Sequence, residues 1–496
     1  MRTWGYYTLS FLTNGLILIF EISGARLLAP YLGTSVGVWA GLIAVILGAM
    51  AIGYHFGGRF ADSNSTTDRI GLTLLASAGA SLLAWSMRDL IPTWLINPEN
   101  SVTTEAVVVG AILFMPTVIL LAAISPMLAK NLIKKMETTA KVVGELNAVG
   151  TAGSIVGAVA TGLFLIPNFG VSEIFLAIPI ILFFTAVLLL AGRLKKYIPF
   201  AVLCVAVALS VNAIPTRADE VIADVSTAYN RIFVYRPGHG DVLGMADSPW
   251  GVQCAMKVDE NNVADETDVS FSYLFAYDMV VRHFFPQRID RALFLGGCVE
   301  VFPRFILKHY PETIADSVEI DPGVTEIARK YFGFRDENFP TLTIHHEDAR
   351  TFINETQDRY DMVMLDVWDP SGRPLFYMAS TEAFARVREA LAPNGIVIMH
   401  INGIPSNKKS YMTSSTLKTI RSVFKYARLY QFKNDPDSLQ NLIIVLSNDR
   451  ELPDVFTNDV YPGQKLSAFE PTAPGIVFTD NYAPVDGFAD WNSLIK

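Results

Sequence analysis

The sequence predicts a multi-span α-helical membrane domain in residues 1–216, a small β-sheet in residues 217–262 and a Rossmann-like α/β domain in residues 263–496. Three observations lead to this prediction. Apolar runs long enough to cross a bilayer fill the first part, short β-rich runs fill the second, and strands alternate with helices through the third. Only 18% of the 496 residues are charged, whereas soluble proteins carry about 25%.

Seven apolar runs in the first part are candidate spans, because about 20 apolar residues cross the hydrocarbon core of a bilayer. The seventh is the shortest, at about 17 residues. The first run is not a cleaved signal peptide, since it contains Glu21 and is followed at once by another span. The runs are centred in residues 6–25, 35–57, 70–87, 105–128, 143–166, 171–192 and 198–214.

The charges of the loops predict an orientation. One side of the bundle receives ten Lys and Arg residues, and the other receives only Arg26 and Arg88. The positive-inside rule makes the first side cytoplasmic, and seven spans then put the C-terminal half outside the cytoplasm. If residues 198–214 instead lie along the interface or re-enter, that half is cytoplasmic. The ten residues are Arg2, Arg59, Arg69, Lys130, Lys134, Lys135, Lys141, Arg193, Lys195 and Lys196.

Two features of the spans stand out. Glu21 lies in the middle of a span, with Arg26 five residues on. An ionisable group inside a membrane is a functional candidate, and the alternatives are a structural pair or an interface charge. Small residues crowd the fifth span, which favours close helix packing. Its glycines are Gly150, Gly153, Gly157 and Gly162.

The rest of the chain is acidic. It holds 27 Lys and Arg against 39 Asp and Glu, whereas residues 1–216 hold 12 against 9. No basic face of the density that nucleic-acid binding needs is present. Three cysteines exclude a disulfide scaffold, and their spacing fits no zinc site. Cys254 and Cys298 could pair in an oxidising compartment, but two free buried thiols are the favoured interpretation.

Strands and helices alternate from about residue 270 onward. This βαβ alternation predicts a parallel sheet in a doubly wound fold, and ligands of such sheets bind beyond the carboxyl ends of the strands. Strands are expected at residues 291–297, 316–321, 342–349, 360–370 and 395–401, and helices at residues 270–285, 301–310, 322–332, 349–356 and 380–391.

Polar residues gather at those strand ends. Two glycines after the first strand would let a ligand approach the backbone, and Glu319 after the second could hold ribose hydroxyls. Asp348, after the third strand, could accept a hydrogen bond from an adenine-like amino group. Asp366 and Asp369, after the fourth, offer carboxylates to a cationic amine, which one of them could deprotonate. Together these residues favour a methyltransferase-type site for an S-adenosylmethionine-like molecule.

At these residues the sequence resembles the spermidine synthase (polyamine aminopropyltransferase) family, and in particular its bacterial members fused behind a multi-span membrane domain. The resemblance covers nearly the whole chain, and DxxDP after a strand is its most specific motif. The motifs of the C-terminal half are STAYNRIFVY, LFLGG, VEIDPGVTEIARKYF, HEDARTFI, YDMVMLDVWDP and TDNYAPVD. Those of the membrane half include FLTNGLILIFEISGARLLAPYLGTS and ELNAVGTAGSIVGAVATGLFLIPNFG.

The resemblance implies an enzyme of polyamine biosynthesis at a bacterial plasma membrane. It would transfer an aminopropyl group from decarboxylated S-adenosylmethionine, a co-substrate, to a polyamine-type amine such as putrescine. Asp366 would be the proton acceptor. No metal is implied. The partners would be the amine and the lipid bilayer, with no nucleic acid, and a homo-oligomer is neither required nor excluded. The donor would contact Gly296, Gly297, Glu300, Glu319, Asp348 and Ala349, and the amine would contact Asn230, Gln253, Tyr273, Asp369 and Asp480.

The sequence departs from the family pattern around the donor. The family's glycine loop GGGDGG is GGCVEV here, so Cys298 and Glu300 replace glycines. Val299 replaces the aspartate expected to hold the donor's amino group, and Glu300 is the candidate substitute for that acid. Leu274 follows Tyr273 where the family has a histidine.

Two other functions remain open. The losses in the glycine loop favour a non-catalytic domain that binds a cationic ligand and is coupled to the membrane bundle. The layout of the nucleoside site also suits an S-adenosylmethionine-dependent methyltransferase. His345 and His346 precede two acidic residues, but consecutive strand residues point to opposite faces of a sheet, so packing is favoured over a metal site.

Overall fold

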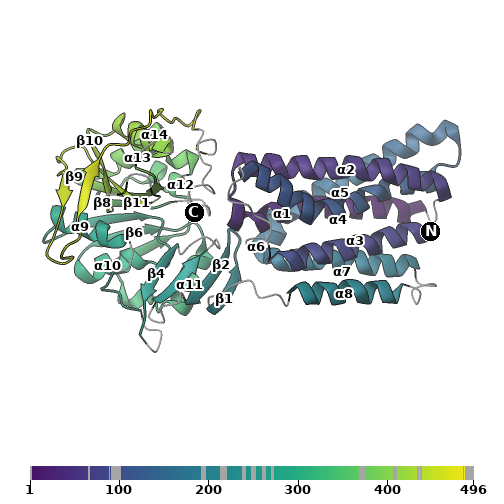
Figure 1. Cartoon of the computed structure of the whole chain (residues 1–496), viewed down its shortest axis with the longest axis horizontal. Helices are drawn as coiled ribbons and strands as arrows, with labels where there is room; N and C mark the ends of the chain where they lie inside the picture. Colours follow the sequence, from purple (N-terminus) through teal and green to yellow (C-terminus); the bar gives the residue numbers. More distant parts are fainter. Residues whose placement is uncertain are drawn as a thin grey trace. The chain divides into compact units, whose positions relative to one another are not determined.

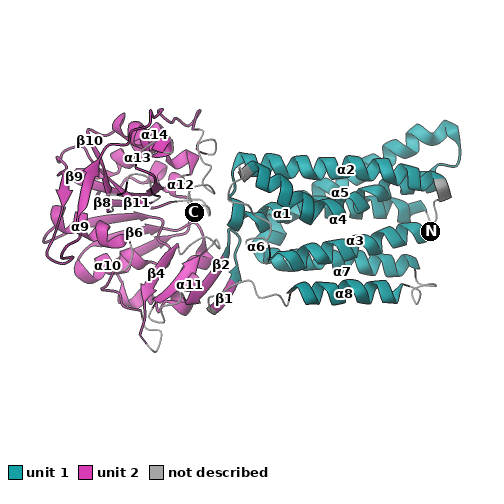
Figure 2. Ribbon diagram, in the orientation of Figure 1, with its two compact units in different colours: residues 1–218, 225–231 teal, residues 219–224, 232–496 magenta. Residues whose placement is uncertain are grey.

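The computed structural model forms two compact units, residues 1–218 with 225–231 and residues 219–224 with 232–496 (Figure 2). It describes residues 3–64, 67–88, 90, 102–190, 197–212, 220–236, 242–246, 253–259, 264–269, 273–367, 375–405, 410–432, 435, 438, 440–483 and 485.

The first unit is a bundle of long apolar helices, drawn in Figure 1. Six helical segments of its described residues are long and apolar enough to cross a membrane, which agrees with the first six predicted spans. The fifth segment contains a π-helical turn at Thr161–Leu165 before the short α6 (Ile166–Asn168). The principal helices are α1 (Thr3–Leu32), α2 (Val36–Asn64), α3 (Thr67–Met87), α4 (Val102–Leu132), α5 (Thr139–Ala160) and α7 (Val171–Leu190).

The seventh predicted span is the shorter helix α8 (Ile198–Asn212), of 15 residues. It packs against α3, because a Cβ added to Gly79 would lie 2.7 Å from the Cys204 sulfur. The end of α7 lies near the start of α3, where a Cβ on Gly71 would lie 2.8 Å from Leu190. Helix α8 runs beside α3 as part of the bundle (Figure 1).

Glycines bring the helices into backbone contact. A Cβ on Gly153 would lie 2.1 Å from the carbonyl oxygen of Phe11, and one on Gly157 would lie 2.4 Å from that of Gly15. Since lipid removes the hydrophobic drive between helices, such close approach supplies the van der Waals contact that holds α5 on α1. The packing interpretation is confirmed for these glycines, but it fails for Gly162, beside which the described residues leave open space.

The second unit begins with a four-stranded sheet in the order β1-β2-β3-β4. Strands β2 and β3 pair antiparallel, as do β3 and β4. The inner positions are apolar, with Ile232, Val234 and Leu243 buried. The strands are β1 (Glu220–Ser226), β2 (Arg231–Arg236), β3 (Val242–Ala246) and β4 (Cys254–Lys257).

A nine-stranded sheet forms the core of the unit, in the order β12-β13-β10-β11-β9-β8-β5-β6-β7. The first five of these strands along the chain, β5 to β9, are parallel neighbours, as predicted. They are β5 (Arg291–Leu295), β6 (Ile314–Val318), β7 (Leu342–His345), β8 (Tyr360–Leu365) and β9 (Leu391–Gly403).

The sheet continues beyond β9 with four strands that the sequence analysis did not predict. β11 (Gln440–Ser447) runs antiparallel to both β9 and β10 (Tyr426–Gln431). The short β12 (Val455–Phe456) and β13 (Leu466–Phe469) complete the edge. The helices of the unit are α9 (Leu274–Phe284), α10 (Val301–His309), α11 (Pro322–Tyr331), α12 (Ala349–Glu355), α13 (Thr381–Glu389) and α14 (Tyr411–Arg421).

The strand order places the site. From β5 the chain moves outward to β6 and β7, and it then returns to place β8 and β9 on the other side of β5. The order therefore reverses between β5 and β8, and open α/β sheets bind their ligands outside the carboxyl ends of the strands at such a switch point. The segments that follow β5 and β8 carry Gly296 and Asp366.

Candidate functional site

The turn at Gly296 and the segment at Asp366 pack closely together at the switch point. The Gly296 amide donates to the Val318 carbonyl at 3.0 Å, and the Asp366 amide donates to the Leu295 carbonyl at 2.9 Å. Gly296 has φ +93°, and a Cβ on it would lie 2.2 Å from the Asp366 carbonyl oxygen. Only glycine fits here, both for its backbone angle and for the space. The glycine turn and the predicted proton acceptor are thus held together.

Two side chains lie next to the Asp366 carboxylate. The Tyr273 hydroxyl, at the start of α9, donates to Asp366 Oδ2 at 2.5 Å. The His400 ring, from β9, lies with Nδ1 3.5 Å from Asp366 Oδ1. Burial raises the pKa of Tyr273 well above 10, and the Asp366 charge and hydrogen bond raise it further. The tyrosine therefore stays a hydrogen-bond donor to Asp366.

The structure adds three residues that the sequence analysis missed. His400 stacks on Tyr273 with ring centroids 4.1 Å apart, and its Nε2 lies 2.8 Å from Asn441 Oδ1. Tyr277, one turn along α9, is fully buried and packs edge-on against Tyr273. A histidine near the carboxyl end of a core strand was the available signal for His400. Nothing in the sequence pairs Asn441 with it, since β11 was not predicted.

Glu319 follows β6, as expected for a ribose-binding acid. Its carboxylate accepts the Asp321 amide at 3.0 Å. Burial raises the pKa of Glu319 to about 8, and the charges of Glu300 and Asp321 add to the shift. A pair of ribose hydroxyls could donate to such a carboxylate, and hydroxyl donors would favour its charged form.

Glu300 lies inside the protein. Its side chain has no exposed surface, and burial raises its pKa to about 7. The carboxylate lies close to Ser317, because a Cβ on Gly297 would lie 2.5 Å from both Glu300 Oε1 and Ser317 Oγ. Val299 is equally buried. Neither side chain that takes the place of the family's acid and glycine offers a surface atom to a ligand.

The loop after β5 has left-handed backbone angles at two residues that are not glycine. Cys298 and Glu300 have φ of +50° and +58°, in the left-handed region that glycine occupies at least cost. Cys298 forms a disulfide with Cys254, the first residue of β4. The prediction of two free thiols is therefore wrong: 44 residues separate the two cysteines, and folding of the small sheet against the loop brings them together.

Asp348 caps α12. Its carboxylate accepts the amides of Arg350 at 2.8 Å and Thr351 at 3.1 Å, and Tyr377 donates to its other oxygen at 3.1 Å. Ala349 follows as the first, buried residue of the helix. The Arg350 side chain donates to Asp480 at 2.8 Å, so Asp348 and Asp480 both contact Arg350 of α12. These contacts include neither Asp366 nor Tyr273.

The remaining predicted amine contacts are dispersed. Asn230 lies in the turn between β1 and β2, where its backbone pairs with Thr227, and this turn belongs to the first unit. Gln253 is exposed, and its amide donates to the Met245 carbonyl at 2.9 Å. Asp369 lies outside the described residues.

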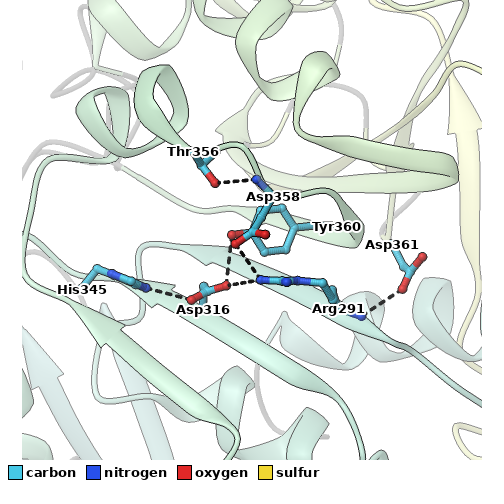
Figure 3. A network of polar contacts seen from close by, with 7 residues as sticks. All are labelled: Arg291, Asp316, His345, Thr356, Asp358, Tyr360 and Asp361. Atoms are coloured by element: carbon cyan, nitrogen blue, oxygen red, sulfur yellow. Dashed lines mark hydrogen bonds and ion pairs between the residues drawn. The ribbon is translucent and has the colours of Figure 1, made fainter.

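His345 belongs to a polar network within the sheet (Figure 3). Its Nε2 lies 2.8 Å from Asp316 Oδ1, and Asp316 also binds Tyr360 at 3.0 Å and Arg291 at 3.3 Å. His346 is exposed. The described residues include no group of three His, Cys, Asp or Glu side chains that could hold a metal ion.

Strand order and site together define the class. Five parallel strands with a reversal between β5 and β8, an antiparallel β11, and polar residues at the carboxyl ends describe an α/β domain of the methyltransferase type.

Comparison with known proteins narrows the class. Residues 275–457 match the family model of the spermine/spermidine synthase domain. A probable polyamine aminopropyl transferase of Bifidobacterium longum is 34% identical over 135 residues, 27% of this chain and 29% of that protein. Polyamine aminopropyltransferase 1 of Streptomyces coelicolor is 25% identical over 467 residues, 87% of this chain and 81% of that protein. A probable spermidine synthase structure from Corynebacterium glutamicum is 17% identical with a TM-score of 0.38, over 48% of this chain and 82% of that chain. Residues 275–457 therefore resemble the spermine/spermidine synthase domain, and the matched relatives are polyamine aminopropyltransferases.

Proposed function

We propose that this chain is a membrane-anchored aminopropyltransferase that moves an aminopropyl group from decarboxylated S-adenosylmethionine to a polyamine-type amine. One observation carries the proposal: the Asp366 carboxylate, held by Tyr273 at 2.5 Å, lies at the switch point and interlocks with the glycine turn at Gly296. Such a transfer needs a base at the edge of the sheet where open α/β folds bind their ligands.

The chemistry follows from the charges. An ammonium group entering the site loses a proton to Asp366, which frees the nitrogen lone pair. That lone pair forms a bond to the aminopropyl carbon beside the sulfonium, the C–S bond breaks, and its electron pair stays on sulfur as a thioether. The sulfonium is a good leaving group, so alignment and the base supply most of the catalysis.

The donor side fits in part. Glu319 offers a carboxylate after β6 for the ribose. The space that a Cβ would take on Gly296 and Gly297 is already filled by Asp366, Glu300 and Ser317. Glu300 was the candidate for the donor's amino group, but its complete burial supports a role inside the loop instead. The sites of Asp348 and Ala349 at the adenine remain a prediction, with Asp348 also serving as a helix cap.

The test is direct. The full-length protein in detergent, given the donor and putrescine, should form the aminopropylated amine and the 5′-methylthio nucleoside. Asp366→Asn should lower turnover by about 100-fold or more and leave nucleoside binding intact. Asp361→Asn is the matched control, since Asp361 lies at the other end of β8 and accepts backbone amides. Equal activity of wild type and Asp366→Asn would refute the proposal.

A second function has specific support. The buried Val299 and Glu300 and the disulfide at Cys298 suit a domain that no longer binds the donor and instead binds a cationic ligand at Asp366. Calorimetry separates the candidates. Binding of putrescine without any nucleoside favours this function, and binding of S-adenosylmethionine in preference to its decarboxylated form favours a methyltransferase.

We also propose that the catalytic domain faces the non-cytoplasmic side of the membrane. The turn at residues 226–230 belongs to the first unit. Arg26, toward the end of α1, donates to the Ala228 carbonyl at 2.5 Å, and a Cβ on Gly170, just before α7, would lie 2.8 Å from Ser226. The chain therefore leaves the bundle at the end with few loop charges, which the positive-inside rule assigns to the outside.

Two further observations support this orientation. Helix α8 lies in the bundle beside α3, which supports an odd number of crossings. The Cys254–Cys298 disulfide would persist in an oxidising compartment. Reporters fused after Lys496 test the proposal. A phosphatase that needs export should be active and a cytoplasmic fluorescent reporter dark, with the opposite pattern after Lys135 as the control. A fluorescent fusion at Lys496 would overturn it.

A further inference from the structure

We propose that His400 is a positioning residue that receives, through Asp366, the proton lost by the attacking amine. The inference deepens the proposed function and rests on it. Its basis is a row of three side chains, Asn441–His400–Asp366, in which His400 is buried.

The chain sets the tautomer of His400. Its Nε2 lies 2.8 Å from Asn441 Oδ1, an oxygen that can only accept. Nε2 therefore carries a proton, and in the neutral ring Nδ1 presents its lone pair. That lone pair faces Asp366 Oδ1 at 3.5 Å. A proton that reaches Asp366 thus finds a second acceptor directly behind it, whereas without that proton the lone pairs of carboxylate and imidazole face each other.

The surroundings leave His400 little freedom to move. It is 5% exposed and stacks on Tyr273 with an interplanar angle of 13°. Tyr273 and Tyr277 from α9 and Asn441 from β11 lie beside the Asp366–His400 pair. Both tyrosines have pKa values well above 10, because they are buried and because the Asp366 charge lies nearby. They cannot take the proton at neutral pH, and Asn441 cannot take it at all.

The proposed proton transfer and aminopropyl transfer conserve atoms and charge. The ammonium N–H breaks and its proton passes to Asp366 Oδ1, then to Nδ1, which leaves an imidazolium beside an ionised carboxylate. The neutral amine attacks carbon, and the C–S electron pair remains on sulfur. The new secondary amine forms as a cation next to the Asp366 anion. By holding the first proton, His400 keeps Asp366 negative while positive charge develops on nitrogen, which stabilises the transition state.

A binding experiment separates this role from packing. Putrescine binding to the full-length protein is followed by calorimetry at pH 7.5 in two buffers of different ionisation enthalpy, which gives the number of protons released. We expect almost none from wild type, since the proton stays on His400. We expect close to one from His400→Gln, which keeps a partner for Asn441 but cannot take a proton. Equal proton release from the two proteins would overturn the inference.

Turnover gives the second readout. His400→Gln should lose about 10- to 100-fold in kcat at neutral pH, and the pH profile of kcat should differ between the two proteins. A lower kcat with an unchanged pH profile would mean a packing role and would overturn the inference. Absence of putrescine binding to wild type would instead refute the proposed function itself, so the two failures are distinguishable.

Discussion

The switch point has two sides, the proposed amine side at Asp366 and the proposed nucleoside side at the loop after β5, and they differ in how closely they match the family pattern. On the acceptor side, Asp366 and Tyr273 form a short hydrogen bond, and His400 stands behind them. On the donor side, the loop after β5 keeps left-handed backbone at Cys298 and Glu300 although the family's glycines are gone. Loop shape is therefore set by the strand ends and by Gly296, while the side chains at its tip are free to change their chemistry.

The largest effect is expected where the two sides meet. Gly296→Ala would place a Cβ 2.2 Å from the Asp366 carbonyl at φ +93°. We expect a loss of stability on the order of 5 kcal/mol, together with loss of both nucleoside and amine binding. Gly333→Ala is the control, because Gly333 also has positive φ, at +66°, but open space around it, so only about 1–2 kcal/mol should be lost.

Thermal unfolding of the two variants measures the difference. If Gly333→Ala unfolds at as low a temperature as Gly296→Ala, backbone angle alone accounts for the loss, and the interlock of the two turns has no energetic weight.

The disulfide distinguishes the donor side from the acceptor side. Cys254→Ser should cost about 4 kcal/mol in the loop-entropy description of a crosslink across 44 residues. Because the crosslink ends in the glycine loop, we expect nucleoside affinity to fall while putrescine affinity stays within about twofold. Calorimetry with each ligand checks this, and Cys204→Ser in α8 is the matched control. A drop in putrescine affinity alone would contradict the division into two sides.

Buried acids on the donor side predict a dependence of stability on pH. The pKa of Glu300 is about 7 when folded against 4.5 ordinarily. Below pH 4.5 the group is protonated in both states. Between 4.5 and about 7 the unfolded chain ionises first, so stability falls as pH rises, by an amount on the order of 3 kcal/mol. Glu319 extends the decline toward pH 8.

Glu300→Gln removes that contribution. Denaturant unfolding should show the variant gaining stability over wild type at pH 8 and not at pH 4.5. An identical difference at both pH values would show that Glu300 is ionised in the folded protein across this range.

Much of the fold could be predicted from local patterns. Apolar length identified the spans, and alternation identified β5 to β9, since β8 is buried on both faces and reads as an apolar run. Asp366 and Glu319 could be predicted because they directly follow strands, and the carboxyl ends of parallel strands lie at the same edge of a sheet. Contacts that depend on long-range pairing had no such signal.

Three outcomes illustrate that limit. The Cys254–Cys298 bond joins a strand of the small sheet to the turn after β5, and no spacing rule covers its 44-residue separation. His400 reaches the site only because β9 lies beside β8, and Asn441 reaches His400 only through the antiparallel β11. The inward direction of Glu300 follows from a left-handed residue, and substitution of a glycine does not reveal which way the new side chain will point.

The smallest predicted effect calibrates the others. Tyr360 donates to Asp316 at 3.0 Å in the network of Figure 3, while Asp316 keeps His345 and Arg291 as partners. Tyr360→Phe therefore removes one buried hydrogen bond and should cost about 1–2 kcal/mol. The contacts of this network among the described residues include neither Asp366 nor the glycine loop, so ligand affinities and turnover should match wild type. Tyr360→Phe is expected to lower stability and nothing else. If its activity equals that of wild type, the losses in Asp366→Asn and Cys254→Ser come from the side of the site that each substitution changes. If its activity is reduced, low stability by itself limits the assay.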